Sequence, residues 1–364
     1  MELAIVIMAG GVGTRLYPAS TRERPKQFIP WPPFDSAEAL AAAEGLGNGN
    51  GLVDGANGVE RRASLIQRAY ARLAPLAGTD RVFIAATSEL LSEIEQNLPH
   101  TPKQNIILEP MRRNSAGACA FATAYVADRV GLETVVVIVP ADAVVLDEEV
   151  YQATVKQAAA LAHEHRGSVV VGVRPDRPAT EYGYVSLGDP VGDGAHRVGR
   201  FIEKPTLERA LVLLSEGCLW NAGIFVWRGD TARTAFQQFL PVHGRLFDGD
   251  LSHSRVRAIF QEMPVVSVDV GIAERADNVY CVPGEFRWDD LGAWDAFSRV
   301  LPADESGNVH VGKARFVQSE NCVTVADGGE VIALGVSDLV IVRFGDVVLV
   351  CPRSRAQDVG KLAP

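Results

Sequence analysis

The sequence has no run of about 18 consecutive apolar residues, which is the shortest stretch that forms a membrane-spanning helix. Its opening residues, MELAIVIMAGG, carry neither the basic start nor the small-residue cleavage site of a secretory signal, and are typical of a buried strand. The sequence therefore predicts a protein that has no membrane partner.

Clusters of basic residues and paired cysteines are also missing. Lys and Arg number 35 against 45 Asp and Glu, a net charge of −10, whereas a nucleic-acid-binding protein needs a basic face. This balance excludes a nucleic-acid partner and fits a cytoplasmic enzyme. The five cysteines lie far apart without any CxxC, so we predict free thiols rather than a disulfide framework or a zinc site.

The first part of the chain instead alternates apolar strands with helical segments. The apolar runs are typical of strands buried on both faces of a parallel sheet. We predict strands at 3–9, 82–87, 134–140 and 168–173, and helices at 64–76, 88–98, 115–130 and 149–165. The fold class is therefore α/β, a Rossmann-like domain with a mixed, mostly parallel sheet. Ligands of such sheets bind beyond the carboxyl ends of the strands, here the loops after Ala9 and Val139.

Two regions depart from this alternation. Residues 32–62 include a stretch from Gly45 to Gly58 in which six of fourteen residues are glycine, which indicates a flexible surface insertion. From residue 300 onward, short Val- and Ile-rich strands follow one another, among them 321–327 and 330–336 as separate strands. We therefore predict a catalytic domain over 1–299 and a small all-β domain of stacked strands over 300–364.

The loop after the first predicted strand carries the most chemical information. Its glycines allow backbone N–H groups to approach a phosphate closely. The candidate nucleotide contacts on this loop are Gly10, Gly11, Gly13, Thr14 and Arg15. It is no dinucleotide-binding fingerprint, because Leu16 stands where the third glycine would be, and no Lys-Ser/Thr pair of a Walker A loop follows. Arg15 and Lys26 add cations suited to a triphosphate.

Together with its continuation, this loop resembles the signature of a known family. GGVGTRLYPASTRERPKQF is similar to the signature loop of sugar-nucleotide pyrophosphorylases, and its ending RPKQF to that of the mannose-1-phosphate guanylyltransferases. The resemblance continues, in order, through LEPMRRNSAGA, VPAD, EYGYV, FIEKP, WNAGIFVW, SVDVGIAE, WDDLGAWDAF and DLVIVRFGDVVLVCPRSRAQDV. It implies transfer of GMP from GTP to α-D-mannose 1-phosphate, giving GDP-mannose and pyrophosphate, and a β-helix-like C-terminal domain.

Such a reaction brings two anions together. Unit charges of like sign about 4 Å apart repel by about 4 kcal/mol at an effective dielectric near 20, so the site needs cations and backbone donors. The resemblance implies that Asp142 and Asp290 hold Mg²⁺ or another divalent cation, with Asp289 as the alternative to Asp290. An Asp at the end of a strand is also a common turn or cap residue. Ala143 departs from the family pattern, in which His is common at this position.

The remaining site residues are also assigned through the resemblance. Lys26 corresponds to the lysine at the reacting phosphates and Arg15 to the arginine on the leaving pyrophosphate; with Asp142 they form the predicted catalytic set. The predicted sugar-phosphate contacts are Gly183, Glu203, Lys204 and Asn221. The predicted guanine contacts are Glu109, Pro110 and Asn114.

Other interpretations stay open at this point. One is a pyrophosphorylase for another sugar 1-phosphate, such as a manno-heptose or glucose, or for another nucleotide. A second is a catalytically inactive regulatory subunit, although the presence of Lys26, Asp142, Lys204 and Asp290 argues against it. The strands of the C-terminal domain present edges that a partner can cover, so we predict a homodimer formed through this domain.

Overall fold

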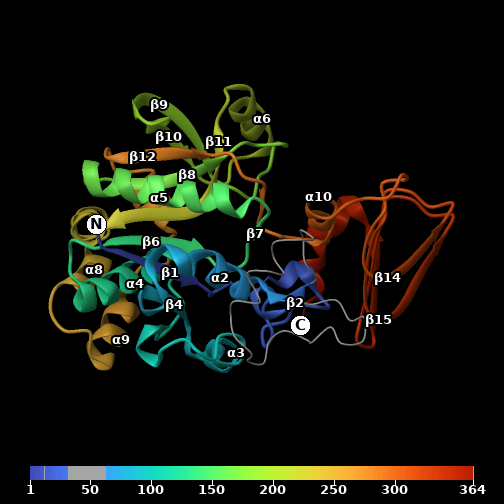
Figure 1. Ribbon diagram of the computed structural model, residues 1–364, viewed down its shortest axis with the longest axis horizontal. Helices are drawn as coiled ribbons and strands as arrows, with labels where there is room; N and C mark the ends of the chain where they lie inside the picture. The colour runs from blue at the N-terminus through green and yellow to red at the C-terminus, as the bar shows by residue number, and fades with distance from the viewer. Residues whose placement is uncertain (12, 32–62, 364) are drawn as a thin grey trace.

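The computed structural model describes residues 1–11, 13–31 and 63–363, and it contains one large and one small β-sheet as its main elements (Figure 1). The glycine-rich insertion predicted at 32–62 lies outside the described residues. The predicted boundary at 299/300 falls inside the short helix α10, Phe297–Val300, and the division into domains stays a prediction.

The large sheet has nine strands in the order β5-β4-β1-β6-β11-β8-β12-β10-β9. The bounds are β1 Leu3–Met8, β4 Val82–Thr87, β5 Ile106–Glu109, β6 Val135–Pro140, β8 Ser168–Val173, β9 Tyr184–Gly192, β10 Ala195–Ile202, β11 Leu219–Arg228 and β12 Val279–Gly284. Only β11 and β10 run against the other strands of this sheet. The predicted mixed α/β sheet is confirmed.

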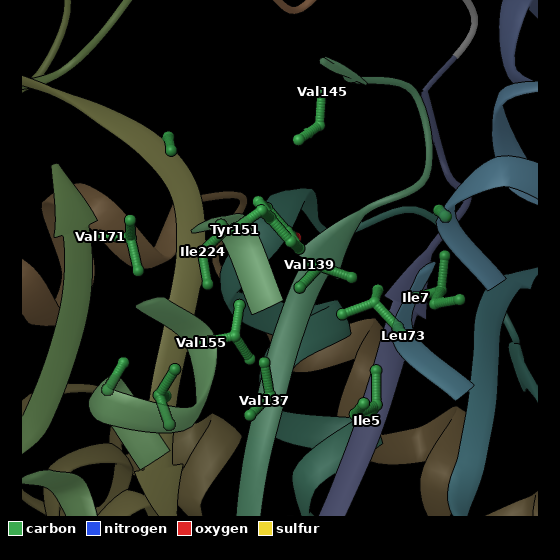
Figure 2. Packing of buried hydrophobic residues seen from close by; sticks show 14 of the residues in the cluster. Ile5, Ile7, Leu73, Val137, Val139, Val145, Tyr151, Val155, Val171 and Ile224 are labelled. Atoms are coloured by element: carbon green, nitrogen blue, oxygen red, sulfur yellow. The ribbon is translucent and has the colours of Figure 1, made fainter. Parts of the chain in front are cut away.

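Helices cover both faces of this sheet. Their bounds are α2 Leu65–Ala77, α3 Leu91–Asn97, α4 Asn114–Val130, α5 Glu148–His165, α6 Leu207–Ser215, α7 Gly229–Phe239, α8 Pro241–Gly244 and α9 His253–Glu262. Figure 2 shows how Val137 and Val139 of β6 pack with Val155 of α5 in the core on one face. The opposite face packs against α4, α7 and α9. No helix within the described residues is long and apolar enough to cross a bilayer.

The small sheet contains β14 Val309–Val317, β15 Val323–Leu334, β16 Leu339–Phe344 and β17 Val347–Pro352. The first three strands are parallel, as stacked rungs require, and β17 pairs antiparallel with β16. The prediction of separate strands at 321–327 and 330–336 is wrong, because residues 323–327 and 330–334 belong to one continuous strand, β15. Gly328 and Gly329 adopt φ values of +79° and +69°, so the chain turns a corner without ending the strand.

A third hydrophobic cluster joins the C-terminal region to the loop after β1. It contains Leu16 and Trp31 from that loop, and Val340 and Val359 from the C-terminal region. Trp294 lies between the two and donates a 2.9 Å hydrogen bond to the carbonyl of Tyr17. The C-terminal region therefore supports the glycine-rich loop directly.

His243 of α8 is a buried histidine, on the face of the large sheet that packs against α4, α7 and α9. Its side chain is inaccessible to solvent, its ring stacks on Phe236, and within the described residues neither ring nitrogen has a hydrogen-bond partner. Burial lowers the pKa of His243 to about 4, because the charged imidazolium loses its hydration. The folded protein therefore holds this ring neutral.

This burial predicts a loss of stability on acidification. The unfolded chain takes up a proton at His243 below about pH 6.5, whereas the folded chain does so only near pH 4, so stability falls between these values. At pH 5 the loss attributable to this residue is about 2 kcal/mol. We expect His243→Phe to remove this part of the pH dependence in urea unfolding at pH 7.5 and 5. Identical pH dependence in both proteins would contradict the assignment.

Candidate functional site

The candidate site begins at the loop that follows β1. The amide of Gln27 braces this loop by donating to the carbonyls of Ala9, at 2.7 Å, and Gly11, at 2.9 Å. Gly13 has φ +69°, and a Cβ there would lie 2.7 Å from Cγ of Lys26. Only glycine therefore allows the loop to fold back onto Lys26. Among the described residues, no atom lies within 4 Å of a Cβ built on Gly10, apart from its own chain neighbours.

Lys26 is the centre of the site. It begins the short 3-10 turn η2, Lys26–Phe28, and is only 5 % exposed. Its Nζ lies 3.0 Å from Oδ2 of Asp142, which follows β6, and donates to the backbone carbonyl of Asp290. Three residues that the sequence places far apart therefore meet at the carboxyl edge of the large sheet.

The carboxylate of Asp290 is held by its own contacts. It accepts hydrogen bonds from the hydroxyl of Tyr182, at 2.6 Å, and from the backbone N–H of Gly292, at 3.1 Å. The Tyr182 ring is packed edge-on against Trp220 and Trp288. Burial first, and then the charge of Asp290, raise the pKa of Tyr182 far above its usual value. Tyr182 therefore remains a hydrogen-bond donor to this carboxylate.

The alternative carboxylate, Asp289, is engaged elsewhere. It is buried, lies 2.6 Å from Nε of Arg299, and accepts a 2.8 Å bond from the N–H of Leu291. Burial is the main cause that raises the pKa of Asp289, and Arg299 opposes it. The geometry thus favours Asp290 over Asp289 beside Lys26.

Asp142 and Asp290 offer the oxygen donors that a hard divalent cation prefers. No group of three or more His, Cys, Asp or Glu suited to a metal occurs among the residues described. Magnesium does not need one, because it usually binds through one or two carboxylates together with water and substrate phosphates. The donor set therefore fits Mg²⁺ bound with a nucleotide. Ala143, beside Asp142, is buried and offers no polar group to such a site.

The four predicted sugar-phosphate residues lie close together: Gly183 directly before β9, Glu203 and Lys204 directly after β10, and Asn221 within β11. Asn221 donates its backbone N–H to the carbonyl of Gly183 at 2.8 Å. A Cβ on Gly183 would lie 2.7 Å from Oε2 of Glu203 and 3.1 Å from Cε1 of Phe201, so a larger residue would displace the Glu203 carboxylate. Lys204 pairs with Glu203, and its backbone N–H donates to the carbonyl of Tyr182 at 3.3 Å. Tyr182 thus connects this group to Asp290.

Asp269, which was not predicted, belongs to the same group. Its Oδ1 accepts a 3.0 Å bond from Nδ2 of Asn221, while Oδ1 of Asn221 accepts from the N–H of Gly223. The orientation of the Asn221 amide is therefore fixed. Burial, and then the charge of Glu203, raise the pKa of Asp269 to about 6. The segment SVDVGIAE was the available signal, because Asp269 stands between two valines there.

The predicted guanine contacts begin at Glu109, the last residue of β5, at the same carboxyl edge. Glu109 is buried, which raises its pKa to about 7 despite the opposing charge of Arg112. Asn114 begins α4 with φ +60°, and its side chain accepts from the N–H of Ser115. Pro110 lies between them and is partly exposed.

Arg15 points toward the C-terminal region. Its NH1 donates a 2.6 Å hydrogen bond to Oε1 of Gln357, in the 3-10 segment η9, Arg353–Leu362. A Cβ on Gly360 would lie 3.0 Å from Cγ of Arg15 and 3.5 Å from the hydroxyl of Thr14. No pattern in the sequence signals this contact or the bracing role of Gln27.

Family models match both parts of the chain. Residues 58–307 match a nucleotidyl transferase model, and residues 312–363 match a model described as a mannose-phosphate isomerase/GMP-like β-helix domain. The second match agrees with the parallel rungs of β14, β15 and β16.

Individual proteins match over nearly the whole chain. A mannose-1-phosphate guanylyltransferase of Klebsiella pneumoniae is 34% identical, over 98% of this chain and 72% of its own length. The xanthan biosynthesis protein XanB of Xanthomonas campestris pv. campestris is 33% identical, over 97% of this chain and 71% of its own. A crystal structure of a Thermus thermophilus protein, described as a mannose-1-phosphate geranyltransferase, has a TM-score of 0.84 and 33% identity, covering 100% of this chain and 98% of that one.

Proposed function

The chain belongs to the mannose-1-phosphate guanylyltransferase family of nucleotidyltransferases, and we propose that it forms GDP-mannose and pyrophosphate from GTP and mannose 1-phosphate. The observation that carries this proposal is the meeting of Lys26, Asp142 and Asp290 beside the glycine-rich loop. The buried cation, paired with the Asp142 carboxylate and bonded to the backbone of Asp290, supports binding of a triphosphate at this loop.

The proposed reaction is a direct displacement at phosphorus. A phosphate oxygen of mannose 1-phosphate bonds to the α-phosphorus of GTP while the bond from that phosphorus to the bridging β-oxygen breaks, and pyrophosphate leaves with the electron pair. We assign Lys26 to the α-phosphate, where its ammonium offsets charge that develops in the transition state. Asp142 and Asp290 would hold Mg²⁺, which when bound supplies further positive charge to the phosphates.

The loop residues bind the rest of the triphosphate in this proposal. The backbone N–H groups of Gly10, Gly11 and Gly13, together with Thr14, face the β- and γ-phosphates. Arg15 binds the pyrophosphate as it leaves, because a guanidinium can donate two parallel hydrogen bonds to phosphate oxygens.

The sugar phosphate binds on the adjacent strands. Lys204 contacts the phosphate, and its side chain is 62% exposed, so it is accessible to a ligand. Glu203 and Asn221 contact sugar hydroxyls, and Gly183 contributes its backbone N–H. Asp269 fixes the Asn221 amide, so that the second N–H of Nδ2 remains available to the sugar.

Guanine binds at the end of β5. Glu109 accepts hydrogen bonds from N1–H and N2–H of the base, donors that adenine does not present together, while Pro110 and Asn114 line the same position. The buried carboxylate supports this assignment, because an acceptor shielded from water discriminates strongly between bases.

The pKa of Glu109 predicts how GTP binding depends on pH. Below about pH 7 the carboxyl becomes protonated and loses acceptor capacity, so KM for GTP rises by about fivefold between pH 7 and 6. Glu109→Gln should show a raised KM for GTP that keeps only the pH dependence due to GTP itself. Steady-state kinetics of both proteins at a series of pH values test this, since protonation of GTP itself affects both equally. Parallel profiles would contradict the role of Glu109.

Two alternatives to this function are compatible with the fold. One is a pyrophosphorylase for another sugar 1-phosphate or nucleotide, and the other is an inactive regulatory subunit. The second is disfavoured because the Lys26–Asp142 pair and the Glu203–Lys204 pair are both intact. The three possibilities can be distinguished by measuring pyrophosphate release with each of four nucleoside triphosphates, combined in turn with mannose, glucose and manno-heptose 1-phosphates. GTP with mannose 1-phosphate should give the highest kcat/KM, and no release from any pair would indicate the inactive subunit.

We also propose that the enzyme is cytoplasmic and forms a homodimer through its C-terminal region. All five cysteines are free thiols, which fits a reducing compartment. The strand β17 lies at the edge of the small sheet, and its Val348 and Val350 are 63% and 56% exposed.

An edge strand with exposed valines invites pairing with a second copy. Val348→Lys should therefore convert a dimer into a monomer, because a charge on the edge opposes pairing. Light scattering coupled to gel filtration measures this mass directly. A monomeric parent protein, or a variant whose mass equals that of the parent dimer, would contradict this interface.

A further inference from the structure

The contact between Arg15 and the C-terminal segment η9 connects the active-site loop to the far end of the chain. Gln357 and Arg15 are 342 positions apart, yet the guanidinium donates to the Gln357 side chain at 2.6 Å. The aliphatic part of Arg15 also lies against Gly360, where a Cβ would approach Cγ to 3.0 Å. Both the head and the stem of this arginine are therefore held by η9.

The segment η9 is itself firmly docked. Ala356 and Val359 are buried in the same cluster as Leu16, the residue that follows Arg15. The apolar side chains of η9 thus anchor it beneath the loop, while Gln357 and Gly360 face Arg15. This arrangement separates packing residues from residues that contact the arginine.

We infer that Gln357 and Gly360 are positioning residues, which hold Arg15 in the orientation that binds the leaving pyrophosphate. An arginine side chain has several rotatable bonds, so fixing it before the substrate binds reduces the entropy lost on binding. One NH1 hydrogen is used by Gln357, and the guanidinium retains other donors for phosphate oxygens. This inference rests on the proposed function, which gives Arg15 its ligand.

The experiment compares variants of η9 in both directions of the reaction. Gln357→Met keeps the length of the side chain and removes the acceptor, and Gly360→Ala pushes against the Arg15 stem. Lys361→Ala is the matched control, because Lys361 lies on the same segment and pairs with Asp358 rather than with Arg15. The parent protein is first assayed with GTP and mannose 1-phosphate, so absence of turnover there rejects the proposed function and not the role of η9.

We expect Gln357→Met and Gly360→Ala to raise KM for pyrophosphate in the reverse reaction by about three- to tenfold, and KM for GTP in a similar way. KM for mannose 1-phosphate and the Tm should remain at the parent values, as should all parameters of Lys361→Ala. In an Arg15→Ala background, Gln357→Met should add no further effect.

Three results would overturn the inference. The first is an unchanged KM for pyrophosphate in both η9 variants. The second is an effect of Gln357→Met of the same size with and without Arg15, since Gln357 would then act independently of the arginine. The third is a lower KM for pyrophosphate, which would mean that Gln357 holds Arg15 away from its ligand.

Discussion

Asp142→Asn and Asp290→Asn should each lower kcat by about a hundred- to a thousandfold, the loss typical when one preorganised charge is removed from a reacting centre. Each substitution keeps the size of the side chain and removes one negative charge from the pair that would hold Mg²⁺. In Asp142→Asn, Lys26 also loses its ion pair at 3.0 Å. Initial rates over a range of Mg²⁺ concentrations should show that both variants need more Mg²⁺ for half-maximal activity.

Asp289→Asn is the matched control for this prediction. Asp289 neighbours Asp290 but pairs with Arg299, so its substitution should lower the Tm and leave the Mg²⁺ dependence unchanged. Near-parental kcat and Mg²⁺ dependence in both Asp142→Asn and Asp290→Asn would remove the metal assignment.

Lys26→Met and Lys204→Met should affect different kinetic parameters. Lys26 is buried and lies between Asp142 and the Asp290 carbonyl, and the proposed function assigns its charge to the phosphorus at which bonds change. Its loss should fall mainly on kcat, by about a hundredfold or more, because the interaction strengthens in the transition state.

Lys204, in contrast, is exposed and assigned to the phosphate of the sugar substrate before reaction. Loss of one charge-assisted hydrogen bond costs about 1.5–3 kcal/mol, so Lys204→Met should raise KM for mannose 1-phosphate by about tenfold to more than a hundredfold. KM for GTP should change little. Varying each substrate in turn tests both variants, and a raised KM for GTP in Lys204→Met would mean that the two halves of the site are reversed.

Much of the large sheet could be predicted from the sequence, because its strands are continuous apolar runs between helical segments. The strands β4 and β8 have the predicted bounds, 82–87 and 168–173, and α4 begins within one residue of the prediction. A short, continuous apolar run between helical segments is typical of a strand buried on both faces of a parallel sheet, so periodicity and composition are enough to predict these strands.

The contacts of the site could not be derived from spacing. Lys26 and Asp290 are 264 positions apart, and only the resemblance to a family brought them into one site before the structure showed their contact. The choice between Asp290 and Asp289 depended on Arg299, which the sequence does not connect to either. Likewise, β15 continues through Gly328 because positive φ turns the strand, whereas glycine pairs usually end one.

The most direct measurement follows the α-phosphorus of GTP labelled with ³²P. The account predicts that, with Mg²⁺ and mannose 1-phosphate, the label passes into GDP-mannose with one pyrophosphate released per molecule, and that no label moves without the sugar phosphate. Asp142→Asn should nearly abolish this transfer. In a parallel assay with unlabelled GTP and ³²P-labelled pyrophosphate, movement of label into GTP in the absence of mannose 1-phosphate would reveal a covalent intermediate. In the first assay, release of labelled GDP or GMP in place of GDP-mannose would show hydrolysis. Either result would contradict direct transfer between the two substrates.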